Sequence, residues 1–421
     1  MKTHLTVLLT LCMAFVSRAQ GQNIPMQSSS RLLRLVQTIP LPTEGYMDRL
    51  TVDVKDQRLF ICGENNKTLI VVDLRAGKVI HETRLAASPK KPIYLPETDE
   101  VWVNMTDNTL VAISGTTYEV TKIVRMSGYG DPNRGGDNGA YDPATHLYYA
   151  AIETFKDSAL EAFRGTKEVT YGGADNHVPS GASIEVVDIR TAELVGSIKM
   201  PGGDPAGVAI EPSGKRLYVT MGDIIGGDSH VAVVDLEKRV LVAQWPITGG
   251  PVPHTAGLDA AHHRLLVGSR IKPNTGEIGG GHQHEPGKLV VMDTETGRVV
   301  QALDSVGGAD DTVYYDEPTG RIYFTGTTGT VAVFQEMDPD HFQLLGKVPT
   351  GAVSKTGLWV PEWKRFYSAV PQHFVLTAPH GSKDIMADLR NELNLKQGMV
   401  APILANLITE PAHLMVFDYL P

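Results

Sequence analysis

The chain contains 421 residues, of which 48 are acidic and 38 are basic, so its formal net charge at pH 7 is −10. Lysine and arginine form no basic stripe, which argues against nucleic acid as a partner, because phosphate contacts need clustered positive charge. The 42 glycines and 26 prolines are scattered singly at expected turns, as is typical of an all-β protein with many short connections.

Residues 1–19 predict a secretory signal peptide. They combine a basic start, an apolar stretch over residues 5–16 and a small residue at Ala19, after which we expect cleavage. The apolar stretch is too short to span a membrane, and no later apolar run is long enough. Cleavage leaves Cys62 as the single cysteine, which rules out an internal disulfide. We expect a periplasmic or secreted protein in which residues 20–31 form a flexible segment.

Seven similar segments of roughly forty residues, apart from insertions, make up the rest of the chain. Each has an apolar strand ending in an acid or its equivalent, a tight turn, a second strand, a variable loop, a third strand that typically ends in aspartate and a last strand. The clearest copies lie at 52–85, 210–247, 258–304 and 315–335, and weaker ones at 94–114, 141–200 and 359–420. Repeated four-stranded antiparallel units predict a seven-bladed β-propeller. The last copy lacks its fourth strand, so we expect residues 32–42 to supply it and close the ring.

Two of the repeats carry a family resemblance. "RLFICGENNKTLIVVDLRAGKVI" (58–80) and "RLYVTMGDIIGGDSHVAVVDLEKRVL" (216–241) resemble YVTN-type repeats. The chain is similar to exported seven-bladed propellers of the YncE or surface-layer YVTN family, which is related to the quinoprotein amine dehydrogenase heavy-chain superfamily. The resemblance covers nearly the whole of residues 32–421 and implies one propeller domain. It implies no particular activity, because such propellers host binding, scaffolding and enzymatic roles.

Three insertions interrupt the repeats, at 154–181, 271–288 and 377–414. The first contains His177. The second contains His282 and His284, which lie on one side of an extended segment and would then share a metal ion; the alternative is a loop without a ligand. The third repeats apolar residues at helical spacing and predicts a small helical insertion in the last blade. It would serve as a lid over the rim or as a contact surface for a partner protein.

Alignment of the repeats on their strand-ending acids predicts a set of residues that converge on the mouth of the central channel. Asp311 belongs to this set, and Asp310 precedes it. The other members and their neighbours are Asp48, Arg49, Lys91, Asp137, Asn138, His254 and Lys355. Carboxylates that face one channel repel one another unless a cation or a hydrogen-bonding ligand intervenes.

Three interpretations of this set remain open. In the first, Arg49, Lys91 and Lys355 neutralise the aspartates in a solvated salt-bridge ring. In the second, Asp48, Asp137 and Asp311 hold a divalent cation with Asn138 or His254. Oxygen ligands favour Ca²⁺, and a strong contribution from the histidine favours Zn²⁺. In the third, the mixed charges bind a polar organic ligand.

Catalytic signatures are mostly absent, including the nucleophile elbow, the P-loop, the His-Glu-x-x-His metal motif and the Cys-x-x-Cys-His haem motif. We therefore expect no haem, and favour an exported binding or accessory propeller. It would capture a small polar ligand, a metal ion or a partner at the charged channel mouth. The alternative is a metal-dependent hydrolase or lyase, similar to a lactonase, that acts in the same funnel. His254 or His177 would then be the general base.

Overall fold

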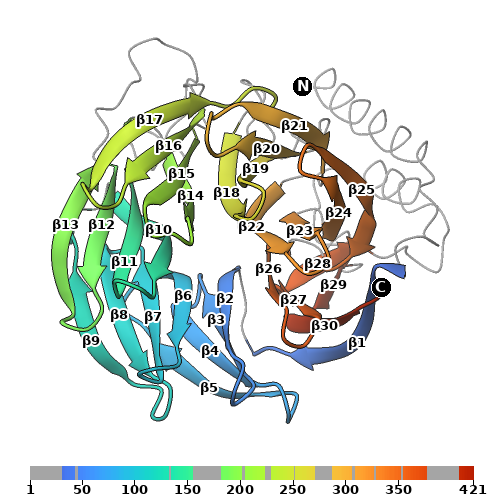
Figure 1. The fold of residues 1–421 in the computed structure, drawn as a ribbon. Coiled ribbons are helices and arrows are strands. Elements are labelled where there is room, and N and C mark those ends of the chain that lie inside the picture. The colour runs from blue at the N-terminus through green and yellow to red at the C-terminus, as the bar shows by residue number, and fades with distance from the viewer. Residues whose placement is uncertain are drawn as a thin grey trace, which may run out of the picture.

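Seven four-stranded antiparallel sheets are arranged radially around a central axis in the computed structural model of the protein (Figure 1). This confirms the predicted seven-bladed β-propeller. The structure describes residues 31–42, 46–131, 134–154, 182–201, 204–222, 229–250, 252–270, 287–305, 309–326, 329–351, 354–376 and 407–421. None of these ranges contains a helix long and apolar enough to cross a membrane.

The first six blades each use four consecutive strands, which follow one another in sequence from the axis outward. Blade one consists of β2 (Met47–Asp53), β3 (Arg58–Gly63), β4 (Thr68–Asp73) and β5 (Lys78–Arg84). Blade two consists of β6 (Pro89–Leu95), β7 (Glu100–Met105), β8 (Thr109–Ser114) and β9 (Val120–Arg125). Blade three consists of β10 (Arg134–Asp142), β11 (Leu147–Thr154), β12 (Ser183–Asp188) and β13 (Glu193–Lys199).

The second half of the ring repeats this pattern. Blade four consists of β14 (Asp204–Ile210), β15 (Arg216–Gly222), β16 (His230–Asp235) and β17 (Val240–Pro246). Blade five consists of β18 (Val252–Asp259), β19 (Arg264–Arg270), β20 (Lys288–Asp293) and β21 (Val299–Asp304). Blade six consists of β22 (Ala309–Asp316), β23 (Arg321–Gly326), β24 (Thr330–Asp338) and β25 (His341–Pro349).

Blade seven joins the two ends of the chain. Its sheet has the order β1–β30–β27–β26, from β1 (Leu33–Pro40) at the outside through β30 (His413–Tyr419) and β27 (Arg365–Val370) to β26 (Thr356–Val360) at the axis. The outermost strand therefore comes from the N-terminal part of the chain, as the incomplete last repeat predicts. Pairing β1 with β30 covers a strand edge that would otherwise be open at the end of the ring.

The last insertion is entered and left through a separate two-stranded sheet. β28 (His373–Leu376) pairs with β29 (Leu407–Glu410), outside the blades. The predicted insertion at 377–414 thus includes β29 and the start of β30 at its C-terminal end. Its predicted helical part lies in residues 377–406, outside the described residues.

In the part of the chain that the structure describes, the core consists of seven apolar clusters, each between two neighbouring blades. Between blades one and two, for example, Phe60 and Val71 pack against Val101 and Val103, and all four side chains are fully buried. The two middle strands of a blade are apolar along most of their length, because neighbouring blades cover both of their faces. The outermost strands alternate between exposed and partly buried residues, as β17 does.

The recurring aspartates at strand ends have a local role. Oδ1 of Asp73 accepts hydrogen bonds from the backbone amides of Arg75 and Ala76, at 2.8 and 2.9 Å. Asp188 and Asp293 bind the turns that follow them in the same way. Aspartate favours such turns because its short side chain reaches the amides two and three residues ahead. Asp73, Asp188 and Asp293 therefore stabilise the turns between the third and fourth strands of their blades.

Candidate functional site

The innermost strands of six blades contain an irregularity in their pairing close to the first residue of the strand. In each case one to three residues are left outside the ladder, as in a β-bulge. A bulge changes the direction in which side chains leave the strand, and bulges are common beside functional sites. The residues at these irregularities are Asp48, Arg49, Lys90, Asp137, Asn138, Ala206, Gly207, His254, Asp310, Asp311 and Thr312. Most of the residues predicted at the channel mouth belong to this set.

Three of them, Asp48, Arg49 and Asp137, form a buried ionic group that we call the charged floor. The Arg49 side chain is 1% exposed, and its Nη1 and Nη2 atoms lie 3.0 and 3.2 Å from Oδ1 and Oδ2 of Asp137. Nη1 also lies 3.3 Å from Oδ1 of Asp48, which accepts a second bond from the Arg49 amide at 2.9 Å. A buried guanidinium thus holds carboxylates from blades one and three.

A more exposed group, which we call the charged rim, contacts the floor through Asp48. It consists of Glu64, Lys90 and Lys355, whose side chains are 25%, 17% and 15% exposed. Nζ of Lys90 lies 3.1 Å from Oδ2 of Asp48 and 2.6 Å from Oε1 of Glu64. Nζ of Lys355 lies 3.4 Å from Oε2 of Glu64 and 3.6 Å from Oδ2 of Asp48. Two lysines from different blades therefore share one glutamate.

The charged rim differs from the prediction at one position. The sequence predicts that Lys91 neutralises the aspartates, but Asp48 and Glu64 pair with Lys90 and with the predicted Lys355. The pairing of β6 with β7 shifts between Pro89 and Lys91, which leaves Lys90 at the irregularity. Burial alone would lower the pKa of Lys90, but the nearby carboxylates raise it above its ordinary value.

Lys91 lies in the same electrostatic environment without an ion-pair partner among the described residues. Burial and the positive charge of Arg49 lower its pKa to about 8, although Cys62, Asp48 and Asp137 act in the opposite direction. At neutral pH Lys91 is therefore protonated, although its surroundings disfavour the positive charge. A negative group near its amine would stabilise that charge.

The other predicted residues are placed as follows. Asn138 uses its side-chain oxygen to accept a bond from the Gly139 amide at 2.8 Å, and is buried with His254 in the innermost strands. Asp310 and Asp311 lie in β22 at the same end as the other bulges, but their side chains are outside the described residues. His177, His282 and His284, with the insertions that carry them, lie outside the described part of the chain.

Sequence reasoning missed Lys90 and Glu64. The pair Lys90–Lys91 offered two candidates. Counting back from Pro96 selected Lys91, but β6 ends at Leu95, and the count that relates Asp48 to Asp53 gives Lys90 when it starts from Leu95. Glu64 follows β3 directly, in the loop between the second and third strands of blade one. The sequence could have indicated Glu64, because it is an acid in a loop that lies on the rim where the innermost strand begins.

Two surface grooves lie away from these charges. One, of about 510 Å³, lies between blades seven and one and is lined by residues including Trp363, Lys364 and Tyr419. The other, of about 580 Å³, lies on blade one and includes Asn66 and Arg84. Neither groove contains a residue of the charged floor or rim. We place the candidate site at the rim, because buried charges from several blades meet there.

The sequence matches no protein-family model and no curated protein. Among solved structures, the chain is similar to one described as Kuenenia stuttgartiensis hydrazine synthase, with a TM-score of 0.61 and 15% identity, over 79% of this chain and 94% of that chain. It is also similar to a chain of a mitotic checkpoint complex, with a TM-score of 0.57 and 10% identity, over 80% of this chain and 88% of that chain. At these identities the similarity concerns the propeller fold alone.

Proposed function

We propose that the protein is an exported binding or accessory propeller of the YVTN-repeat type. It captures a small polar ligand that carries an anionic group, and the charged rim at the channel mouth binds that group. The observation that carries this proposal is the sharing of Glu64 by Lys90 and Lys355, which also contact Asp48 of the ion-paired charged floor. Export is proposed from the signal-peptide pattern of residues 1–19.

The two lysines of the charged rim support an anionic ligand. Lys90 and Lys355 come from different blades and both contact Glu64, so an acid at this position would lie between two ammonium groups. Lysine ammonium groups bind carboxylates and phosphates as point charges. The rigid strands around the rim hold these groups in place before the ligand arrives, which reduces the entropy lost on binding.

A cation bound by Asp48 and Asp137 receives less support from the geometry. Both oxygens of Asp137 contact Arg49, and both oxygens of Asp48 face basic groups. A cation at this position would have to displace the Arg49 guanidinium from two carboxylates. The described residues therefore favour a charge-compensated floor with an organic ligand above it.

Calorimetric titration with small carboxylates and phosphates tests the proposal. Glu64→Gln removes the carboxylate that competes for Lys90 and Lys355, so we expect it to tighten binding of an acid by roughly tenfold. Lys355→Met should weaken binding by a similar factor. Lys347→Met, which removes a half-buried lysine on the outer strand β25, serves as the matched control and should leave affinity unchanged.

The sign of the Glu64→Gln effect separates the alternatives. A cation site at the rim would lose affinity when this carboxylate is removed, whereas an anion site gains it. If no acid binds to the wild-type protein, or if Glu64→Gln leaves the affinity unchanged, the proposal is wrong.

A further inference from the structure

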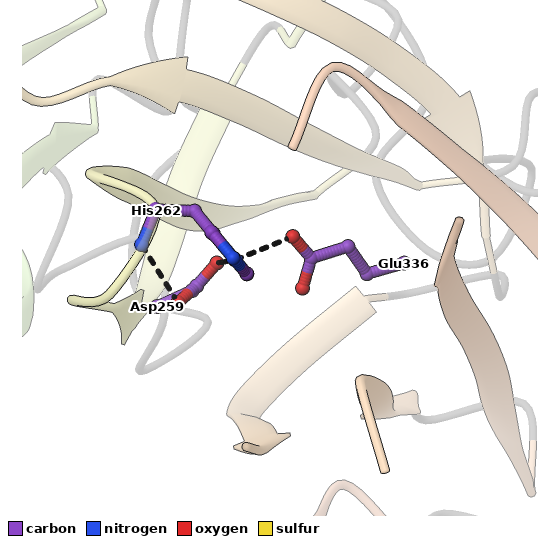
Figure 2. Close-up of side chains that lie close together, drawn as sticks. All are labelled: Asp259, His262 and Glu336. Atoms are coloured by element: carbon purple, nitrogen blue, oxygen red, sulfur yellow. Dashed lines mark hydrogen bonds and ion pairs between the residues drawn. The ribbon is translucent and has the colours of Figure 1, made fainter. Parts of the chain in front are cut away.

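A second group of ionisable side chains lies at the opposite end of the innermost strands, between blades five and six (Figure 2). Asp259 is the last residue of β18, and His262 lies in the turn that follows it. Glu336 reaches the same point from β24 of blade six. Nδ1 of His262 lies 2.9 Å from Oδ2 of Asp259 and 2.8 Å from Oε1 of Glu336.

Each carboxylate is held in position through its other oxygen. Oδ1 of Asp259 accepts a bond from the backbone amide of His262 at 3.3 Å. Oε2 of Glu336 accepts a bond from the hydroxyl of Tyr315, in the innermost strand of blade six. Groups that orient the ligands from behind in this way are typical of metal sites.

One hydrogen on Nδ1 cannot satisfy two carboxylates. The Glu336 side chain is 5% exposed, and its Oε1 atom accepts no hydrogen bond from the part of the chain that the structure describes. A proton on Nδ1 therefore satisfies one of the two carboxylates, whereas a metal ion can contact both.

Equivalent turns in other blades show what is unusual about this one. In blade three, Thr145 donates a bond to Asp142 at 2.7 Å, and in blade six Thr319 donates to Asp316. His262 occupies the corresponding turn position, three residues after the strand-ending acid. Threonine is therefore enough to cap this turn, and the histidine adds a nitrogen ligand that the turn does not require.

The contact between blades one and two provides a second comparison. There Arg58 bridges Asp53 and Asp99, at 2.8 and 2.6 Å, so a permanent cation joins the two blades. Between blades five and six the equivalent arginine, Arg264, contacts Asp293 and Asp340 at 2.9 and 2.8 Å. Asp259 and Glu336 therefore face the imidazole of His262 in addition to this arginine bridge, and a bound metal ion would provide positive charge between these two carboxylates.

We propose that Asp259, His262 and Glu336 bind a divalent transition-metal ion such as Zn²⁺, which joins blade five to blade six. The ligand atoms lie within 4.8 Å of one another, and no other group of this kind occurs among the described residues. Around tetrahedral Zn²⁺, neighbouring ligand atoms are about 3.3 Å apart, so each of the two short contacts must open by roughly 0.5 Å. The His262 side chain is 44% exposed, which permits this movement and lets water complete the coordination.

The test uses the full chain, stripped with a chelator and titrated with ZnCl₂ by calorimetry. We expect one site with a dissociation constant on the order of micromolar, and a higher melting temperature with zinc. His262→Thr retains the cap found in blades three and six but removes the nitrogen ligand, so it should weaken zinc binding at least tenfold. Glu336→Gln should weaken it similarly while keeping an oxygen near Tyr315.

A double variant, His282→Ala with His284→Ala, controls for zinc bound by the histidine pair of the second insertion. This variant should retain the site and the stabilisation by zinc. Cobalt provides a second readout, since absorption of visible light by Co²⁺ reports its coordination by the protein in wild type and its loss in His262→Thr. The proposal is overturned if the wild type binds no zinc, or if His262→Thr and Glu336→Gln bind it as tightly as the wild type does.

Discussion

Arg49 and Asp137 are joined by two parallel contacts of 3.0 and 3.2 Å, although 88 positions separate them in the sequence. Arg49 lies in β2 of blade one and Asp137 in β10 of blade three, so the ion pair joins two blades that are separated by blade two. An arginine that is 1% exposed therefore connects non-adjacent blades close to the axis. This geometry leads to the first prediction.

Arg49→Met should lower the free energy of unfolding by about 3–5 kcal/mol, because it leaves Asp48 and Asp137 buried without their shared cation. Arg190→Met is the control, since Arg190 pairs with Asp188 at 3.1 Å on the surface and is 62% exposed. Breaking such an exposed pair should cost less than about 1 kcal/mol. Urea denaturation of both variants measures the difference, and equal costs would mean that the floor does not stabilise the ring.

Lys91→Met should raise stability at pH 7. The pKa of Lys91 is lowered from 10.5 to about 8 in the folded protein, so below pH 8 the folded state carries a charged lysine that it disfavours. Between pH 8 and 10.5 the unfolded state binds more protons, and wild-type stability therefore rises relative to the variant. We expect the free energy of unfolding of Lys91→Met to exceed that of the wild type by on the order of 2 kcal/mol at pH 7. This difference should disappear as the pH approaches 10.5.

Thermal melts of Lys91→Met and wild type at several pH values measure this difference. The exposed Lys78→Met, at the start of β5, controls for general loss of positive charge. A stability difference that stays constant from pH 7 to 10.5 would show that the Lys91 amine titrates normally.

Ile39→Ala should destabilise the protein by about 2–5 kcal/mol, because Ile39 is fully buried in the cluster between blades seven and one. Leu35 lies in the same strand β1 but is 47% exposed, so Leu35→Ala should change stability by less than about 0.5 kcal/mol. The comparison tests whether the N-terminal strand closes the ring in solution. Similar melting temperatures for the two variants would contradict this closure.

Cys62 should be unreactive towards Ellman's reagent in the native protein. Its side chain is fully buried, and burial raises the pKa of its thiol, whereas the thiolate is the reactive form. In urea, one thiol per chain should react if the chain begins after Ala19. Rapid labelling under native conditions would show that the interface between blades one and two opens readily.

Most of the fold follows from local patterns in the sequence. Seven repeats of short apolar strands, separated by turns with aspartate or glycine, determine the blades, and the missing strand of the last repeat identifies residues 32–42 as its replacement. These features are readable because strand periodicity and turn chemistry act over a few residues. The repeat alignment also brought Asp48, Arg49 and Asp137 to one end of the ring, where the structure places them together.

The partners of these residues depended on the tertiary structure. The structure places the end of β6 at Leu95, one residue before the predicted Pro96, and this shift of one residue replaces Lys91 by Lys90 in the charged rim. Glu336 meets Asp259 from 77 positions away because the ring places β24 beside the turn after β18. The sequence by itself determined the repeating strands and turns, whose interactions are local. Which charges meet was decided only by closure of the ring, because contacts between blades depend on side-chain directions that residue spacing does not encode.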